Sequence, residues 1–332
     1  MEKVFNQVSK ESKYIKFVYG KGKRKTQEQR DYKLYKSWLD RLEKYEKHLE
    51  IMGERNSYSK TDHDATFMRM KDDHMMNGQL KPAYNIQLST TGQFIIGAYG
   101  SHHPNDVYTL PLFLNKLHPK YNKYLKRIVF DSGYESIENY TYLHEKSLEA
   151  YIKPANYEIS KKKSYKKDIS KREHMTYDEE GDFYICANRK KLFRQKDYLK
   201  TRKSGFKETL RTYKCFECDK CPYQRHCNKY SKSDNPQTKS LKFNSDFIKF
   251  REKSCENIKS DEGIEERLNR SIQAEGMFSK LKEGLNYNRF RHRGLSSIIY
   301  DIQLIALGIN LNQLHRKLQK NQTEIIKYKK AS

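Results

Sequence analysis

The sequence lacks any long apolar run. Its most apolar stretch, residues 298–311, contains Asp301, Gln303 and Asn310 and is shorter than the roughly 20 residues that a membrane-spanning helix needs. No signal peptide is visible in the sequence. These absences predict a soluble, cytoplasmic protein that does not act in a membrane.

Acidic residues are scarce relative to basic ones. The 332 residues hold 67 Lys and Arg against 42 Asp and Glu, which gives a formal charge of +25. Such an excess of positive charge is typical of a protein whose binding partner is rich in phosphate. DNA fits this balance, but RNA and membrane surfaces fit it too. A chain of 332 residues can hold one large domain or two modest ones, and a hydrophobic content of 36% is enough for a core but lean.

Cysteines are few, yet five of the six fall within residues 186–227. In a cytosolic chain this clustering favours metal binding over disulfides. Four thiolates would complete a tetrahedral zinc site, and Cys186 or His226 could replace one of them. An iron–sulfur cluster and free thiols are the alternatives, and Cys255 stands alone as a small buried residue. The predicted zinc ligands, at the spacing C-x2-C-x2-C-x5-C, are Cys215, Cys218, Cys221 and Cys227.

One carboxylate, Asp131, stands at the end of a predicted strand. Residues 126–130 form a short β-branched and aromatic run that stops at this acid and meets Ser-Gly. Residues 134–146 are predicted to form a helix, and residues 150–152 a second strand. The carboxyl ends of strands are where open α/β sheets bind ligands. The alternative is that Asp131 caps the following helix.

A second carboxylate, Glu275, is predicted to lie on the apolar face of a helix. At about 100 degrees per residue, five hydrophobic side chains project within about 80 degrees of its direction. An unpaired buried carboxylate is costly, so a metal ion and a structural salt bridge are both open. Lys282 is about 10 Å away along the helix, which is too far to pair directly. The five hydrophobic residues are Ile264, Leu268, Ile272, Phe278 and Leu285.

These segments resemble two blocks of DDE transposases from bacterial insertion sequences. Residues 131–136 (Asp-Ser-Gly-Tyr-Glu-Ser) are similar to the block with the second catalytic aspartate. Residues 270–278, followed by Lys282, look like the block with the catalytic glutamate. Residues 304–311 match the helix that commonly closes these proteins. The resemblance runs from about Tyr58 to Leu318.

The resemblance implies an α/β fold with a ribonuclease-H-like mixed sheet flanked by helices. Residues 84–88 and 94–98, around a Thr-Thr-Gly turn, predict the β-hairpin that such a sheet would contain. The apolar repeat near the N-terminus is too short for a coiled coil. The expected division is a basic helical arm at 1–56, the first part of the core at 57–159, a Cys-rich basic insertion domain at 160–245, the C-terminal helical part of the core at 246–320, and a disordered tail at 321–332.

The resemblance also implies metal-dependent DNA cleavage and strand transfer of an insertion sequence. Asp131 and Glu275 would hold Mg²⁺ or Mn²⁺, and Lys282 would contact phosphate. The implied partners are double-stranded DNA, as transposon ends and as target, and further copies of the chain on that DNA. The protein would then be associated with the nucleoid. The residues expected to extend the phosphate-contacting surface are Arg289, Arg291 and Arg293.

Two departures from the family pattern affect what is expected of activity. An arginine commonly lies four residues before the glutamate, but Ser271 occupies that position, with Arg270 beside it. The first catalytic aspartate is commonly followed by glycine, and this chain has no Asp-Gly. We therefore expect an N-terminally truncated copy that keeps two of the three ligands and has weak or no cleavage activity, unless Asp62 or Asp64 substitutes from a solvated loop at 58–81. The alternatives are a zinc-dependent DNA-binding or regulatory protein, and a basic RNA-associated protein.

Overall fold

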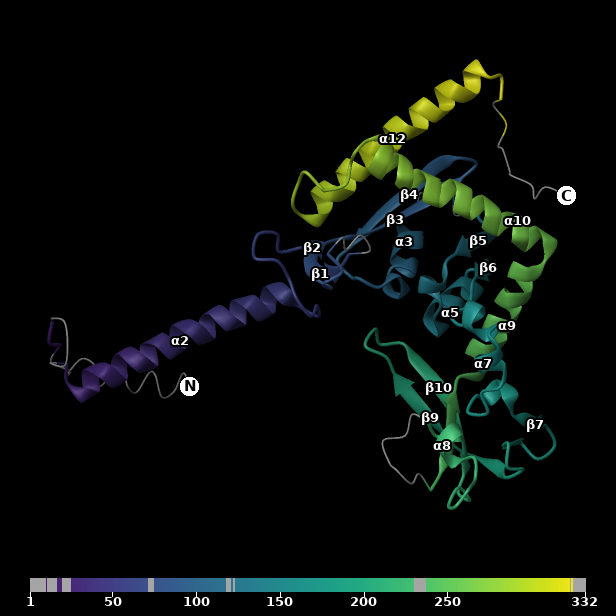
Figure 1. Cartoon of the computed structure of the whole chain (residues 1–332). Coiled ribbons are helices and arrows are strands. Elements are labelled where there is room, and N and C mark those ends of the chain that lie inside the picture. The colour runs from purple at the N-terminus through teal and green to yellow at the C-terminus, as the bar shows by residue number, and fades with distance from the viewer. Residues whose placement is uncertain are drawn as a thin grey trace. The chain divides into compact units, whose positions relative to one another are not determined.

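The computed structural model describes residues 10, 17–19, 25–70, 75–117, 121, 123–229, 237–322 and 324. Helices and small sheets are mixed along the chain (Figure 1), which agrees with the predicted α/β class. The chain divides into two compact units. Unit 1 is Met1–Asn85, Ser101–Pro104 and Arg291–Ile298, and unit 2 is Ile86–Gly100, Asn105–Phe290 and Ile299–Ser332.

Unit 1 contains one long helix and a two-stranded sheet. The helix α2 (Gln27–Met52) begins after Thr26, whose side chain accepts a hydrogen bond from the Gln29 backbone N–H. The strands β1 (Thr66–Arg69) and β2 (Leu80–Ala83) pair antiparallel. The prediction of a solvated loop at 58–81 is therefore wrong for the two strands, while residues 71–74 lie outside the described part of the chain.

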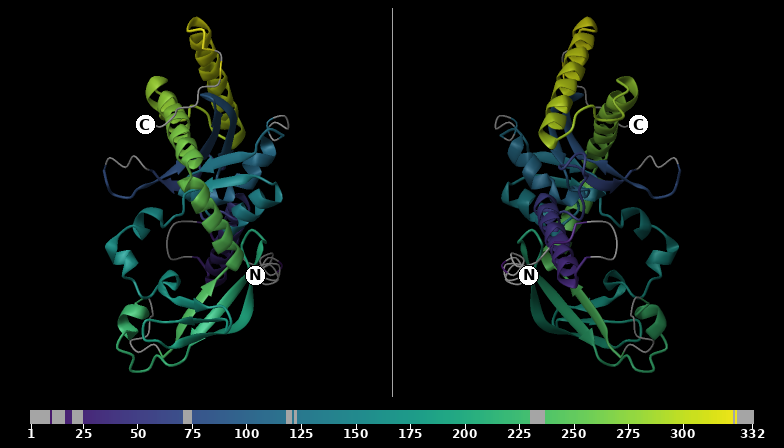
Figure 2. Two further views of the ribbon diagram at one scale, coloured as in Figure 1. Left: turned by 90° about the vertical axis from the view of Figure 1, so that its right-hand side faces the viewer. Right: turned by 90° about the vertical axis from the view of Figure 1, so that its left-hand side faces the viewer.

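A β-hairpin and the last helix pack together in unit 2. The strands β3 (Asn85–Thr91) and β4 (Phe94–Ser101) pair as the sequence predicts, and both turn residues between them have positive φ. The helix α12 (Leu295–Gln319) runs beside this hairpin (Figure 1, Figure 2). The Ile95 backbone N–H donates to the Asn310 side chain at 2.9 Å, and that side chain donates to the Ile95 carbonyl at 2.8 Å.

The strand–helix–strand unit that follows positions Asp131. The strands β5 (Arg127–Phe130) and β6 (Glu149–Ile152) pair in parallel, joined through α5 (Ile137–Glu145). The helix begins three residues later than predicted, because residues 132–134 form the 3₁₀ turn η3 and Ser136 caps α5. The β5–α5–β6 segment shares a buried core with α3 (Leu110–Lys116). Within the described residues no ladder joins β5–β6 to β3–β4, so the ribonuclease-H-like sheet stays a prediction.

Residues 176–243 form an antiparallel sheet of their own, in the region predicted as a Cys-rich insertion. Its strand order is β11-β10-β9-β8-β7, and its buried cluster includes Leu192, Tyr213 and Leu241. The insertion boundaries themselves stay a prediction. The strands are β7 (Thr176–Asp178), β8 (Phe183–Ile185), β9 (Lys191–Thr201), β10 (Lys207–Cys215) and β11 (Lys239–Phe243).

The helix α9 (Ser245–Lys259) links this sheet to a long helical run that carries Glu275. The run comprises α10 (Asp261–Arg270), the π-helical η5 (Ser271–Glu275), α11 (Gly276–Ser279) and the π-helical η6 (Lys280–Gly284). The remaining short elements are η2 (Asp106–Tyr108), α6 (Tyr157–Ser160), α7 (Lys163–Lys166), η4 (Arg172–His174) and α8 (Gln224–Cys227).

The prediction that Glu275 lies on a buried apolar face is wrong. Its side chain is 66% exposed, and Ile272 and Leu285 are exposed as well. A π-helical turn closes its hydrogen bonds over one more residue than an α-turn does. The two π segments therefore rotate the side chains away from a projection at 100 degrees per residue. The residues that are buried along this run are Gly263, Asn269, Gln273, Met277 and Leu281.

The helix α12 is also longer than the apolar stretch at 298–311 suggested. Within the described residues it is the one helix that is long and apolar enough to cross a membrane by length and composition. The expectation that this region is too short to cross a bilayer is therefore wrong, because the helix that contains it is long enough. The finding is weak evidence for a membrane span, because core helices of ordinary globular proteins meet the same criterion.

Candidate functional site

Asp131 follows the last residue of β5, as predicted, but the helix α5 is capped by Ser136 and not by Asp131. Asp131 ends the strand, and its Oδ1 accepts a hydrogen bond from the Gly133 backbone N–H at 2.8 Å, so it caps the turn η3. Its side chain is 46% exposed. A capped but half-exposed carboxylate is held in one orientation and remains reachable from solvent.

Arg270 connects Asp131 with Glu275. Its Nη2 lies 3.4 Å from Asp131 Oδ2, and its Nη1 lies 3.5 Å from Glu275 Oε1. Because both nitrogens belong to one planar guanidinium, the two carboxylates lie against the same cation. The structure thus brings together two acids from distant parts of the sequence, although their catalytic role stays a prediction.

A third carboxylate, Asp106 of η2, lies beside Asp131. A Cβ added to Gly133 would lie 3.0 Å from Asp131 Oδ1 and 3.1 Å from Asp106 Oδ2, so a side chain at this position would crowd both acids. Gln87 donates from Nε2 to Asp106 Oδ1 at 3.2 Å, and its Oε1 is buried without a partner. Sequence reasoning missed Asp106, because it belongs neither to a predicted strand nor to a family block.

Tyr134 adds a hydroxyl to this acidic neighbourhood. Burial raises the pKa of its hydroxyl well above the usual range, and the charges of Asp106 and Asp131 act in the same direction. The phenol therefore stays protonated at neutral pH. A protonated hydroxyl is available there as a hydrogen-bond donor.

The donor set suits Mg²⁺ without forming a complete cage. Among the described residues, no three His, Cys, Asp or Glu side chains already lie close enough to hold one ion. Mg²⁺ usually keeps several waters and takes one or two carboxylates together with substrate phosphates. Asp131 and Glu275 supply two such carboxylates. In this structure the guanidinium of Arg270 supplies the positive charge next to both of them.

The basic residues predicted to contact phosphate are all exposed. Lys282 lies in η6 and Arg289 in the loop that follows, both in unit 2, whereas Arg291 and Arg293 belong to unit 1. The structure describes their exposure but does not test their contact with DNA.

The acids considered as substitutes for a first catalytic aspartate have structural partners within unit 1. Asp64 Oδ2 accepts a hydrogen bond from the Leu295 backbone N–H at 2.9 Å, and Asp62 Oδ1 accepts one from the Gly294 N–H at 3.2 Å. The Tyr84 hydroxyl donates to Asp62 Oδ2 at 2.7 Å. Both carboxylates therefore satisfy free N–H groups at the start of α12.

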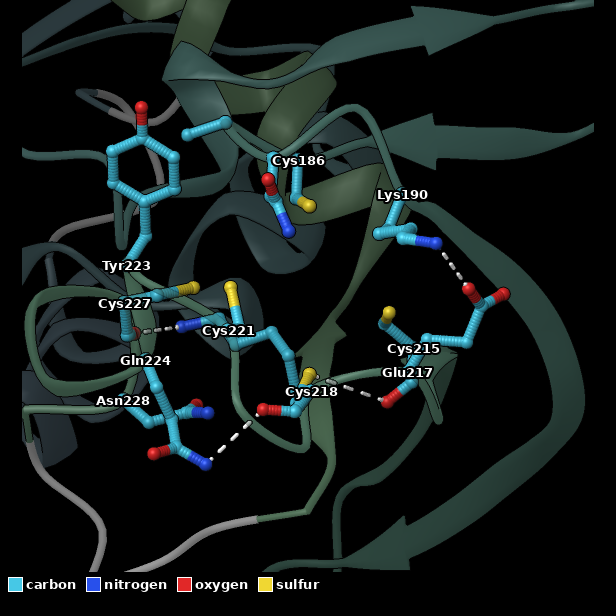
Figure 3. A pocket seen from close by; sticks show the side chains of 13 residues that line it. Cys186, Lys190, Cys215, Glu217, Cys218, Cys221, Tyr223, Gln224, Cys227 and Asn228 are labelled. Atoms are coloured by element: carbon cyan, nitrogen blue, oxygen red, sulfur yellow. Dashed lines mark hydrogen bonds and ion pairs between the residues drawn. The ribbon is translucent and has the colours of Figure 1, made fainter.

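Five cysteines line one pocket in the sheet of residues 176–243 (Figure 3). Burial raises the pKa of the Cys218 thiol to about 12, with Cys215 adding to the effect. Burial also raises the pKa of Cys227, while the nearby charge of Lys239 opposes this shift. His226 is exposed and does not line the pocket. The lining cysteines are Cys186, Cys215, Cys218, Cys221 and Cys227.

Comparison with known families finds a match in the C-terminal part of the chain. Residues 185–315 match the family model described as Transposase DDE domain. The matched span contains the five clustered cysteines, Glu275 and Lys282, and it begins after Asp131. No curated protein and no solved structure matches the chain. The match covers less than half of the chain, and over residues 185–315 the chain is similar to DDE transposases.

Proposed function

We propose that this protein cleaves DNA at the ends of an insertion sequence and joins those ends to target DNA, using divalent metal ions. The observation that carries the proposal is the shared contact of Asp131 and Glu275 with Arg270. The family match supports transposition, and the charge of +25 favours a polyphosphate substrate.

In this proposal Asp131 and Glu275 hold Mg²⁺ or Mn²⁺. Such ions activate a water or a DNA 3′-hydroxyl and stabilise the leaving oxygen in phosphoryl transfer. The Gly133 N–H orients the Asp131 carboxylate, and the Ser271 hydroxyl donates to Glu275 Oε2 at 3.3 Å. Arg270 would place a positive charge beside the phosphate that reacts.

Lys282, Arg289, Arg291 and Arg293 would hold the DNA backbone. Contacts from lysine and arginine to phosphate position a duplex but carry no sequence information. Replacing one of them should therefore weaken binding to all sequences alike. The recognised terminal sequence would have to be read by other residues.

The test is DNA cleavage by the protein with Mn²⁺ or Mg²⁺, using as substrate the genomic DNA that flanks its own gene. Asp131→Asn and Glu275→Gln should abolish cleavage and leave DNA binding largely intact. Glu283→Gln is the matched control, because Glu283 accepts a hydrogen bond from Ser279 at 3.0 Å just as Glu275 accepts one from Ser271. Undiminished cleavage by both site variants would exclude this site.

The cysteine pocket favours a second candidate, a zinc-dependent DNA-binding or regulatory protein without catalytic activity. A structural zinc ion held by cysteines of this pocket is the cofactor that such a protein would need. DNA binding that requires zinc, together with no metal-dependent cleavage, would favour this candidate over the transposase.

We also propose that copies of this chain associate through α12. One face of the helix packs on β3 and β4 through Ala306 and Ile309, while a second face exposes large apolar side chains at heptad spacing. Such a stripe is typical of the seam of a two-stranded coiled coil, and its self-complementarity points to the same helix of a second copy. The exposed residues are Tyr300, Leu304, Leu307, Leu311, Leu314 and Leu318.

A further inference from the structure

Cys186 reaches the cysteine pocket from a different part of the sheet than the other four thiols. It follows β8, in a tight turn in which the Arg189 N–H donates to the Cys186 carbonyl at 2.8 Å and the Cys186 N–H to the Lys190 carbonyl at 3.0 Å. Arg189 has a φ of 56°, which marks the sharp reversal of this turn. Figure 3 shows Cys186 across the pocket from Cys218.

Three of the other thiols lie on a segment whose backbone is already bonded into turns. The Cys221 N–H donates to the Cys218 carbonyl at 3.3 Å, and the Cys227 N–H donates to the Tyr223 carbonyl at 2.8 Å in α8. Lys220, between the first two cysteines, has a φ of 52°. These turns bring the three side chains to the pocket, where each has only one side-chain torsion to adjust.

Cys215 differs from these three because it belongs to a strand. It is the last residue of β10 and pairs with Lys239 of β11. Its side chain lies on the same face as Tyr213, two residues earlier, and the two are 2% and 1% exposed. Cys218 belongs to the same buried cluster, but it lies in a turn, whereas the backbone of Cys215 is fixed by its pairing with β11. Moving Cys215 toward an ion would therefore disturb the sheet.

A buried positive charge lies in the wall of the same pocket. Lys239 is 9% exposed, and its ammonium donates to the Cys227 carbonyl at 2.6 Å and to the Ser170 carbonyl at 3.2 Å. Both acceptors are neutral, so the charge of Lys239 is not offset by them. Four thiolates around Zn²⁺ carry a net negative charge, which a buried ammonium would stabilise.

We infer that Cys186, Cys218, Cys221 and Cys227 bind one structural Zn²⁺, with Cys215 left as a core residue. No three ligands already lie at coordination distance in the described chain, so the thiols must close in on the ion. Each thiol gives its proton to solvent as its S–Zn bond forms, at about 2.3 Å. The ion would tie the β8–β9 turn to the segment after β10. This inference does not depend on the proposed DNA cleavage.

Metal analysis and cobalt substitution of the purified full-length chain test the ligand set. The wild type should carry one equivalent of zinc, and its Co²⁺ form should show the visible bands of tetrahedral cobalt with four sulfur ligands. Cys186→Ser should lower Zn²⁺ affinity at least tenfold and change these bands. Cys215→Ser should keep both properties, as should the controls Cys255→Ser and His226→Ala.

Retention of wild-type zinc affinity by Cys186→Ser, with loss in Cys215→Ser, would overturn the inference in favour of the four cysteines from 215 to 227. Protein that contains no zinc, or that contains iron instead, would also overturn it. Alkylation followed by mass spectrometry gives a readout that needs no variant. Bound zinc should protect Cys186 together with Cys218, Cys221 and Cys227, whereas it should not change the reactivity of Cys255, which is half-buried and not buried as predicted.

Discussion

The guanidinium of Arg270 contacts Asp131 and Glu275. These are the two carboxylates whose charge a bound divalent ion would neutralise. Arg270→Gln should therefore raise Mn²⁺ affinity, because the two carboxylates lose their shared cation. The side chains are partly exposed, so the effect should be at most about fivefold, since exposed ion pairs contribute about 0–1 kcal/mol. Titration calorimetry with Mn²⁺ measures it.

Arg194→Gln is the matched control for this variant. Arg194 also bridges two carboxylates, Asp182 at 2.8 Å and Asp197 at 3.0 Å, but these lie in the sheet of residues 176–243. Removing this arginine should leave Mn²⁺ binding unchanged. Equal affinities for the wild type and Arg270→Gln would show that Arg270 does not compete with the metal.

Asp64 can be tested as a helix cap rather than a catalytic acid. Asparagine keeps a side-chain oxygen at the same reach but carries no charge, so Asp64→Asn should leave stability and DNA cleavage close to the wild type. Asp64→Ala should cost about 0.5–2 kcal/mol of unfolding free energy. Chemical denaturation and the cleavage assay measure the two effects. Loss of cleavage in Asp64→Asn at unchanged stability would instead make Asp64 a catalytic ligand.

At the scale of elements, β6 depends on α9 for some of its hydrogen bonds. The Ser254 hydroxyl is buried, donates to the Ile152 carbonyl at 3.0 Å and accepts from the Ile152 N–H at 2.9 Å. Ser254→Ala would leave both backbone groups buried without partners. We expect a loss of about 1–3 kcal/mol in the free energy of unfolding, measured in urea. The exposed Ser279→Ala is the control, and equal losses in both would contradict this role.

The sequence was sufficient for elements with a clear local pattern. The β3–β4 hairpin and the β5–α5–β6 unit followed from alternation, turn residues and a short β-branched run. The long helical run was harder to predict, since the π-helical segments η5 and η6 shift the side-chain period in a way that residue types do not reveal. That shift explains why Glu275 is exposed although the α-helical projection buried it.

Only part of the candidate site could be predicted, because its residues meet through tertiary packing and not within one local segment. Asp131 and Glu275 each stood out within a local segment, but their common partner depends on tertiary packing. Arg270 was noted only as a neighbour of a family position, and Asp106 had no local signal. The strands of residues 176–243 were also missed, because β9 is exposed along most of its length and shows no buried alternation.

At the scale of the whole molecule, the exposed seam of α12 predicts a dimer. Leu307→Lys with Leu311→Lys would place charges at two neighbouring seam positions, and a coiled-coil interface does not tolerate buried unpaired charge. The variant should be monomeric in sedimentation velocity, at concentrations where the wild type is dimeric. Leu199→Lys, at a position that is 61% exposed on β9, is the control. A wild type that is monomeric would exclude dimerisation through these residues of α12.

The most direct test of the proposed active site asks whether Asp131 and Glu275 bind one metal ion. Fe²⁺ in place of Mg²⁺ generates hydroxyl radicals that cut the polypeptide next to the bound ion. We predict cuts near both residue 131 and residue 275, suppressed by excess Mg²⁺, lost in Asp131→Asn and Glu275→Gln, and retained in Glu283→Gln. Cuts at only one of the two segments, or cuts that persist in both site variants, would contradict a shared metal site.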